Sequence, residues 1–115
     1  MTPTEQDLGT FLRGDTVPEI NFQALDENST PVDITGQIIN SQIRFGAKAG
    51  QLRLDIALTS GITIVDAAQG QFKFDAFQLE FWNVGTYFYD IQFNDAGTIT
   101  TRFTGKLLIE QDVTE

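Results

Sequence analysis

The feature that most constrains the fold is an alternation of apolar and polar residues with a period of two, which recurs along most of the chain. In residues 87–93 and 103–109, every second residue from the first is apolar or glycine. Successive side chains of a strand point to opposite faces of a sheet, so this pattern predicts strands that bury one face. Shorter runs of the same kind cover residues 20–24, 43–45, 52–58, 62–64 and 72–74.

Segments rich in turn-forming residues separate these runs. Residues 26–31 (DENSTP) combine carboxylate, amide and hydroxyl side chains with a proline, and residues 94–97 (NDAG) read as a hairpin turn with Gly97 at positive φ. Helical signal is weak, with at most one turn each in residues 31–36 and 75–82. Regularly spaced short strands of this kind predict an all-β fold, an antiparallel β-sandwich of about seven to nine strands.

One corner narrows the type of sandwich. Gly85 and Thr86 precede Tyr87, which then opens an alternating strand. Immunoglobulin-like domains often place a tyrosine at such a corner, with its ring inside and its hydroxyl bonded to upstream backbone. Tyr87 fits this structural role, which favours an immunoglobulin-like sandwich, although the chain has no cysteine for the disulfide of antibody domains.

The length of 115 residues suits a single domain. We expect residues 1–10, which are mostly polar, to form a loose N-terminal segment, and residues 11–115 to form one β-sandwich domain. No basic and apolar leader and no apolar run of membrane-spanning length is visible.

Composition removes several kinds of chemistry. The chain has no histidine and no cysteine, which excludes the commonest general base and thiolate nucleophiles, so a small enzyme is disfavoured. Its net charge is −9 and its seven basic residues are scattered, which argues against nucleic acid and anionic membranes as partners. Asp26, Asn28 and Thr30 alternate as in calcium loops, but the central glycine and distal glutamate of such loops are missing, so a polar loop is favoured. We therefore predict no enzymatic activity, no cofactor, no metal and no small-molecule substrate.

The aromatic residues point to a partner surface. Phe81 and Trp82 are consecutive, and Phe88 alternates with Tyr87 and Tyr89, so an extended chain cannot bury all of them on one face. Trp82 and Phe88 are therefore candidate partner-binding residues in an exposed apolar patch. The alternative is that Trp82 fills one end of the sandwich and that Phe88 packs beneath a loop.

Arg13-Gly14-Asp15 is the tripeptide that many adhesion receptors recognise. Short motifs recur by chance, and this one stands directly before the first predicted strand. We favour the interpretation that it serves folding, with Gly14 relaxing the backbone where the strand begins.

Several segments, taken in order, resemble one family. They are RGDT at 13–16, PVDITG at 31–36, IRF at 43–45, GTYFYDIQF at 85–93, Gly97, TTRFTGKLLI at 100–109 and DVT at 112–114. With these segments the chain resembles the N-terminal domain of the baseplate upper protein of tailed bacteriophages and related small tail proteins. It departs from them in lacking a glycine before Pro31 and in ending at Glu115, where the baseplate upper protein continues into a long oligomerising region.

The resemblance implies a phage or prophage virion structural protein, a tail or baseplate component that is made in the bacterial host cytoplasm. Its partners would be other virion proteins and possibly further copies of itself. An alternative is a β-sandwich module that binds carbohydrate or a cell surface, which needs aromatic rings beside carboxylates or amides on an accessible face. In the sequence, residues 81–83 (FWN) are the cluster of this kind.

Overall fold

The computed structural model describes residues 4–46, 51–58, 61–79 and 82–111, and within them the protein is built from β-strands. Eleven strand segments occur in the described residues. Eight of them have four or more residues, and this number agrees with the predicted seven to nine strands. The prediction of an all-β sandwich is confirmed. The segments are β1 (Thr4–Glu5), β2 (Gly9–Leu12), β3 (Thr16–Val17), β4 (Ile20–Gln23), β5 (Ile38–Phe45), β6 (Gln51–Leu58), β7 (Gly61–Asp66), β8 (Gln71–Phe74), β9 (Phe77–Gln78), β10 (Gly85–Asp95) and β11 (Thr98–Glu110), with a short 3-10 helix, η1 (Ala67–Gln69).

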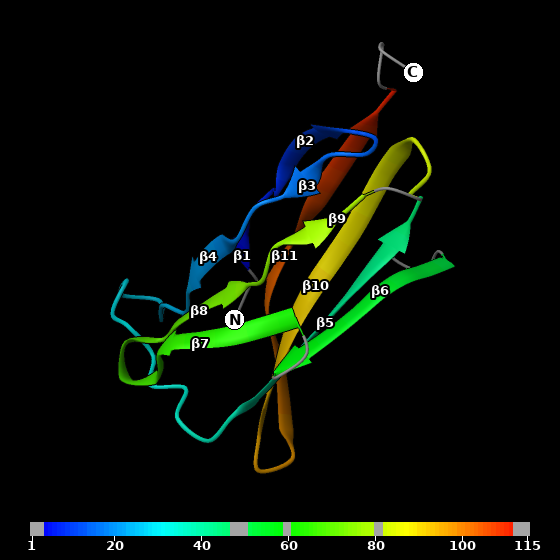
Figure 1. Ribbon diagram of the computed structural model, residues 1–115. Coiled ribbons are helices and arrows are strands. Elements are labelled where there is room, and N and C mark those ends of the chain that lie inside the picture. Colours follow the sequence, from blue (N-terminus) through cyan, green and yellow to red (C-terminus); the bar gives the residue numbers. More distant parts are fainter. Residues whose placement is uncertain (1–3, 47–50, 59–60, 80–81, 112–115) are drawn as a thin grey trace.

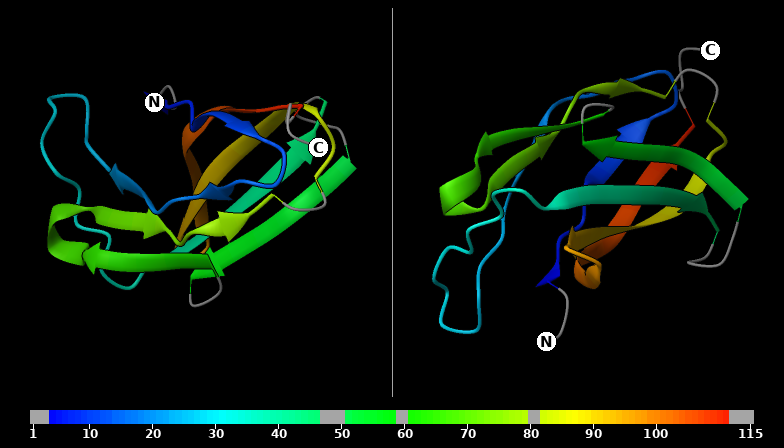
Figure 2. Two further views of the ribbon diagram at one scale, coloured as in Figure 1. Left: turned by 45° about the horizontal axis from the view of Figure 1, so that its top comes forward. Right: turned by 90° about the horizontal axis from the view of Figure 1, so that it is seen from below.

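The strands form two layers (Figure 1, Figure 2). One layer runs β11–β10–β5–β6, with β1 and β2 along the outer edge of β11, and the other consists of β7, β8 and β4. The chain passes between the layers after β6, where only Ala57 and Leu58 pair with β7. β3 and β9 form a separate two-stranded sheet. The molecule measures 45 × 26 × 25 Å, and β11, with 13 residues at about 3.3 Å each, spans nearly its whole length.

Aromatic rings from both layers meet in the core. Phe22 of β4 packs against Phe103 of β11 with ring centres 5.2 Å apart, and Phe72 of β8 packs against Phe93 of β10 at 5.4 Å. Both pairs are edge-to-face, an arrangement worth about 0.5–1.5 kcal/mol beyond the burial of the rings. The period of two predicted these positions, because the alternate residues of β10 and β11 from Tyr87 and Phe103 onward are buried.

The prediction of a loose N-terminal segment is wrong for residues 4–10. β1 and β2 pair with β11 in parallel, and between them the Gln6 and Leu8 amides donate to the carbonyls of Thr104 and Lys106, both at 2.8 Å. The Gln6 side chain also donates to the Asn21 carbonyl of β4, so this segment closes the side of the sandwich between the two layers. Its polar composition concealed this role because the contacts are made mainly by the backbone.

The β10–β11 hairpin turns as predicted. Asp95 pairs with Thr98, which leaves a two-residue loop, and both loop residues have positive φ, 51° at Ala96 and 96° at Gly97. This is the geometry of a type I′ turn, whose twist matches that of the flanking strands. Asn94 supports the loop, because its side-chain oxygen accepts from the Gly97 amide at 2.9 Å.

Of the segments in which single helical turns were expected, 31–36 and 75–82, the described parts (31–36, 75–79 and 82) contain no helix. The first makes a turn in which the Gln37 amide donates to the Ile34 carbonyl, and the second contains β9. The 3-10 helix lies instead between β7 and β8, at residues 67–69. No helix in the described ranges is long and apolar enough to cross a membrane.

Candidate interaction face

Tyr87 and Trp82 belong to the core. Tyr87 is 1% exposed and its hydroxyl donates to the Asn83 carbonyl at 2.8 Å, which is the contact that defines a tyrosine corner. Trp82 is 6% exposed, with ring centres 5.0 Å from Tyr87 and 5.6 Å from Phe77. A turn in which the Trp82 amide donates to the Leu79 carbonyl directs the indole inward. The prediction that Trp82 lies in an exposed partner-binding patch is therefore wrong, and its ring fills the core as the alternative expected.

Phe88 points the other way. It lies on β10 between the buried Tyr87 and Tyr89, and its side chain is partly exposed on the outer face of the sheet. The register places it between Arg44 of β5 and Lys106 of β11, and the Lys106 ammonium lies 5.9 Å from the centre of its ring. Phe88 thus remains a candidate partner-binding residue, and its surroundings define the site.

The outer face of β5, β10 and β11 carries polar side chains in cross-strand rows around Phe88. The register aligns Gln42, Asp90 and Thr104 in the row next to Phe88, and Asn40, Gln92 and Thr101 in the row beyond it. We call these six residues, with Arg44, Phe88 and Lys106, the Phe88 face.

A bulge in β11 shapes this face. The pairing of β10 with β11 shifts by one residue between Ile91 and Gln92, so that Arg102 is the extra residue on β11. The Arg102 guanidinium lies over the Phe93 ring, 5.4 Å from its centre. Thr101 and Thr104 are three residues apart, and a regular strand would place them on opposite faces. The extra residue brings both to the outer face.

Two hollows lie next to each other on this face. One, of about 230 Å³, is lined by Gln42, Arg44, Phe88, Asp90, Thr101 and Thr104. The other, of about 310 Å³, is lined by Asn40, Gln42, Asp90 and Gln92. Both hollows include Gln42 and Asp90 in their linings, so they are neighbours. We call the two hollows together the trough, which has Phe88 toward one end and Gln92 toward the other.

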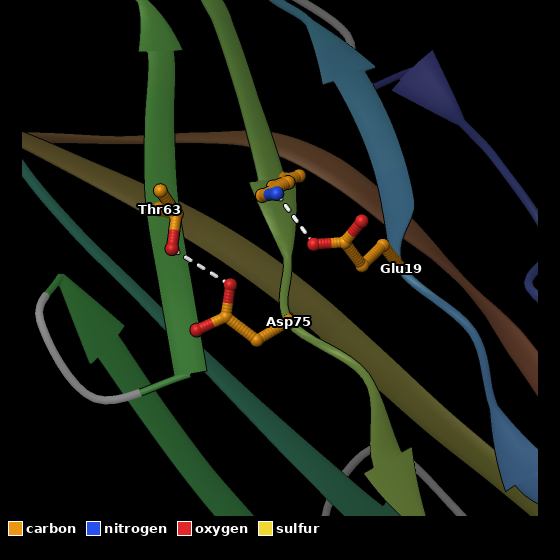
Figure 3. A network of polar contacts seen from close by, with 4 residues as sticks. Glu19, Thr63 and Asp75 are labelled. Carbon is orange, nitrogen blue, oxygen red and sulfur yellow. Dashed lines mark hydrogen bonds and ion pairs between the residues drawn. The ribbon is translucent and has the colours of Figure 1, made fainter.

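On the outer face of the opposite layer, two pairs of polar side chains bind each other (Figure 3). Lys73 of β8 forms an ion pair with Glu19, and the Thr63 hydroxyl donates to Asp75 at 2.7 Å. The hydrogen bond with Glu19 raises the pKa of Lys73, so the ammonium form is stabilised there. These four side chains therefore bind each other.

On the Phe88 face, Arg44 donates to the Gln42 side chain at 2.7 Å. Within the part of the chain that the structure describes, the side chains of Asn40, Asp90 and Gln92 have no hydrogen-bond partner. The trough therefore offers amide and carboxylate groups to an external molecule.

The Phe88 face carries charges of both signs. Arg44 and Lys106 are positive and Asp90 is negative, while Glu5 pairs with Thr104 at one margin and Asp55 pairs with Gln42 at the other. The two cations are not part of a larger basic cluster of the kind that phosphate chains need.

Arg13-Gly14-Asp15 forms the turn between β2 and β3. The Asp15 amide donates to the Leu12 carbonyl, and the Asp15 carboxylate accepts from the Leu12 amide, both at 3.0 Å. Gly14 has φ of 96°, which explains the need for glycine there. The triplet is exposed, but the Asp15 carboxylate folds back on its own turn, in keeping with a role in folding.

The alternating oxygens of residues 26–30 also serve the local backbone. One carboxylate oxygen of Asp26 accepts from the amides of Asn28 and Thr30, at 2.8 and 3.0 Å. Among the residues that the structure describes, no group of three or more acidic, histidine or cysteine side chains is arranged to hold a metal ion.

No protein-family model matches the chain, and no curated protein matches it either. The resemblance to baseplate upper proteins therefore remains an interpretation of the sequence. The site itself was only partly visible in the sequence: Phe88 was named, but its neighbours come from three strands whose register no single segment reveals.

Proposed function

We propose that the protein is a non-enzymatic structural protein of a phage or prophage particle, a tail or baseplate component that acts by binding neighbouring proteins. It would be made in the host cytoplasm and reside in the virion. The sequence resemblance suggests this class, and one structural observation supports an assembly role, namely the edge of β6.

β6 is paired along one side only for most of its length. Gln51 to Ala57 pair with β5, whereas pairing with β7 is limited to Ala57 and Leu58. Between Gln51 and Ile56 the second edge has no ladder partner among the described residues. An unpaired strand edge presents backbone donors and acceptors that an extended segment of another chain can extend as a further strand.

Exposed apolar side chains add a second contact near the hairpin. Ile38 and Ile99 both pair with Asn94, from either side, and are 52% and 62% exposed. Because the acidic chains repel one another at a distance, close association needs apolar contact of this kind. The isoleucines, rather than Trp82, supply it.

The test is whether the chain is built into particles through the β6 edge. Particles released from the source bacterium after prophage induction are purified, and the chain is sought by mass spectrometry. Neighbouring residues of a strand direct their amides to opposite edges. Of the two variants Asp55→Pro and Ile56→Pro, one therefore loses a hydrogen bond to β5, and the other loses only an amide on the free edge. The variant that loses only the free-edge amide should fold and be missing from particles.

Each outcome has a clear meaning. Absence of the wild-type chain from particles contradicts the proposed function. Incorporation of the folded proline variant at the wild-type level contradicts the role of the β6 edge while leaving the class of protein intact. Ile99→Lys, measured in the same particles, reports on the apolar contact separately.

A further inference from the structure

We propose that the Phe88 face binds an uncharged oligosaccharide. This inference concerns a different surface from the β6 edge and does not depend on the proposed assembly role. It follows from the side chains that the trough presents, from their arrangement in rows, and from what the local charge and pairing exclude.

The chemistry of the face matches that of a sugar ring. One side of a pyranose consists largely of C–H groups, which pack against an aromatic face, while its rim carries hydroxyls that both donate and accept hydrogen bonds. Phe88 offers a partly exposed ring, and the side chains of Asn40, Asp90 and Gln92 offer donors and acceptors that are not used within the described protein. The Lys106 ammonium lies over the ring, 5.9 Å from its centre, and adds a donor on that side.

The rows place these groups at spacings that suit hydroxyls two or more carbons apart on a sugar ring, or hydroxyls of successive rings. Neighbouring strands lie about 4.8 Å apart, and alternate residues of one strand about 6.7 Å apart. Gln42 and Asp90 share one row, and Asn40 and Gln92 share the next, so four polar side chains form a patch beside the Phe88 ring. A ring stacked on Phe88 would leave its neighbours in the chain above this patch.

The shape of the trough favours a chain over a single sugar. The two hollows share Gln42 and Asp90 in their linings, so they lie next to each other on the surface. Two neighbouring hollows give room for more than one sugar unit.

The local charge disfavours phosphorylated and strongly acidic ligands. Recognition of phosphate chains needs clustered Lys and Arg. Here Asp90 lies in the centre of the trough, opposite Gln42 and Thr104, where it repels an anion. Arg44 and Lys106 stand only in the row of Phe88.

Backbone pairing disfavours an extended peptide. β10 is paired with β5 on one side and β11 on the other along most of its length, so the floor of the trough offers few free backbone groups. A peptide strand is recognised mainly through such groups, as at the β6 edge. Recognition at the Phe88 face must come from side chains, as it does for sugars.

The experiment is a glycan array probed with the purified full-length chain. The array holds short neutral oligomers of glucose, galactose, mannose and N-acetylglucosamine, together with galacturonate and sulfated oligomers as acidic counterparts. Titration calorimetry with the best neutral oligomer then compares wild type with Phe88→Ala, Asp90→Ala and Phe88→Tyr. Thr63→Ala, on the opposite outer face, is the matched control.

We expect binding to at least one neutral oligomer, a loss of about tenfold or more in affinity for Phe88→Ala, and retention of binding by Phe88→Tyr and Thr63→Ala. Emission from the buried Trp82 verifies that each variant is folded. The inference is overturned if no neutral oligomer binds, if only acidic oligomers bind, or if Phe88→Ala and Asp90→Ala bind as the wild type does.

Discussion

Gly105 of β11 is the position where a single methyl group should detach the N-terminal segment. A Cβ at this buried residue would lie 2.2 Å from the Gln6 carbonyl oxygen and 2.7 Å from Cε1 of the Tyr89 ring. Real Cβ atoms do not approach other atoms so closely, and the obstacles are backbone and a buried ring rather than a flexible side chain. Gly105→Ala should therefore displace the segment that contains Gln6.

The contacts at risk set the size of the effect. Displacement weakens the bonds from Gln6 and Leu8 to β11 and the bond from the Tyr89 hydroxyl to the Gln6 carbonyl, each worth about 1 kcal/mol net. Exposure of Leu8, now 9% exposed, adds about 2 kcal/mol. Chain entropy regained by the freed residues offsets part of this sum. We expect a net loss of about 2–3 kcal/mol in the free energy of unfolding, within the range for overpacked sites.

Urea denaturation followed by the fluorescence of Trp82, the single tryptophan, measures the loss. Amide hydrogen exchange adds a local test, because Leu8 should lose protection in Gly105→Ala while Ile91 keeps it. The same substitution in a variant lacking residues 1–8 should cost less than about 1 kcal/mol, since only the Tyr89 ring still obstructs it. An equal cost in both backgrounds, or a loss below about 0.5 kcal/mol in the full chain, would refute this reasoning.

Three further predictions concern Tyr89, Ala96 and Asp26. Burial, and to a smaller extent the charges of Asp7 and Glu5, raises the pKa of Tyr89. The contribution of the protonated Tyr89 hydroxyl to the free energy of unfolding is therefore complete below about pH 10 and is lost as the pH rises further. Above about pH 10 the wild type should lose up to about 1.4 kcal/mol per pH unit more than Tyr89→Phe in urea denaturation, and parallel curves would contradict this. Ala96→Asn should stabilise the protein by about 0.5–1 kcal/mol, because asparagine tolerates positive φ better than alanine, and an unchanged calorimetric midpoint would count against the turn assignment. Asp26→Ala should cost about 1–2 kcal/mol by removing the acceptor for two loop amides, while added Ca²⁺ should leave the wild-type midpoint unchanged, and a Ca²⁺-dependent rise would reveal a cation site.

The sequence predicted the buried face of the long strands because burial there depends only on whether a residue stands at an odd or an even position along the strand. Tyr87, Tyr89 and Ile91 point inward for the same reason that Phe88 and Asp90 point outward. The hairpin at Gly97 was equally predictable, since a two-residue loop with positive φ has few acceptable sequences.

Features that depend on distant segments were not predictable in this way. Trp82 is buried by ring contacts with Phe77 and Tyr87, and the sequence showed only two adjacent aromatic residues. The N-terminal segment binds β11 mainly through its backbone, and one buried leucine, Leu8, among polar residues is too little to show a strand pattern. The rows of the Phe88 face depend on the register of β5 against β10, and on a bulge opposite Gln92 that changes the parity of β11.

The parallel pairing of the first strands with β11 has a mechanical consequence. Thr4 of β1 lies beside Phe103, and Leu12 of β2 lies beside Glu110, so β1 and β2 run in the same direction as β11. Tension applied at residues 4 and 111 pulls the N-terminal strands and β11 in opposite directions along the strand axis. The hydrogen bonds between them are then loaded in shear, all together, instead of breaking one after another. The protein should therefore resist stretching between these two points far better than its modest size suggests.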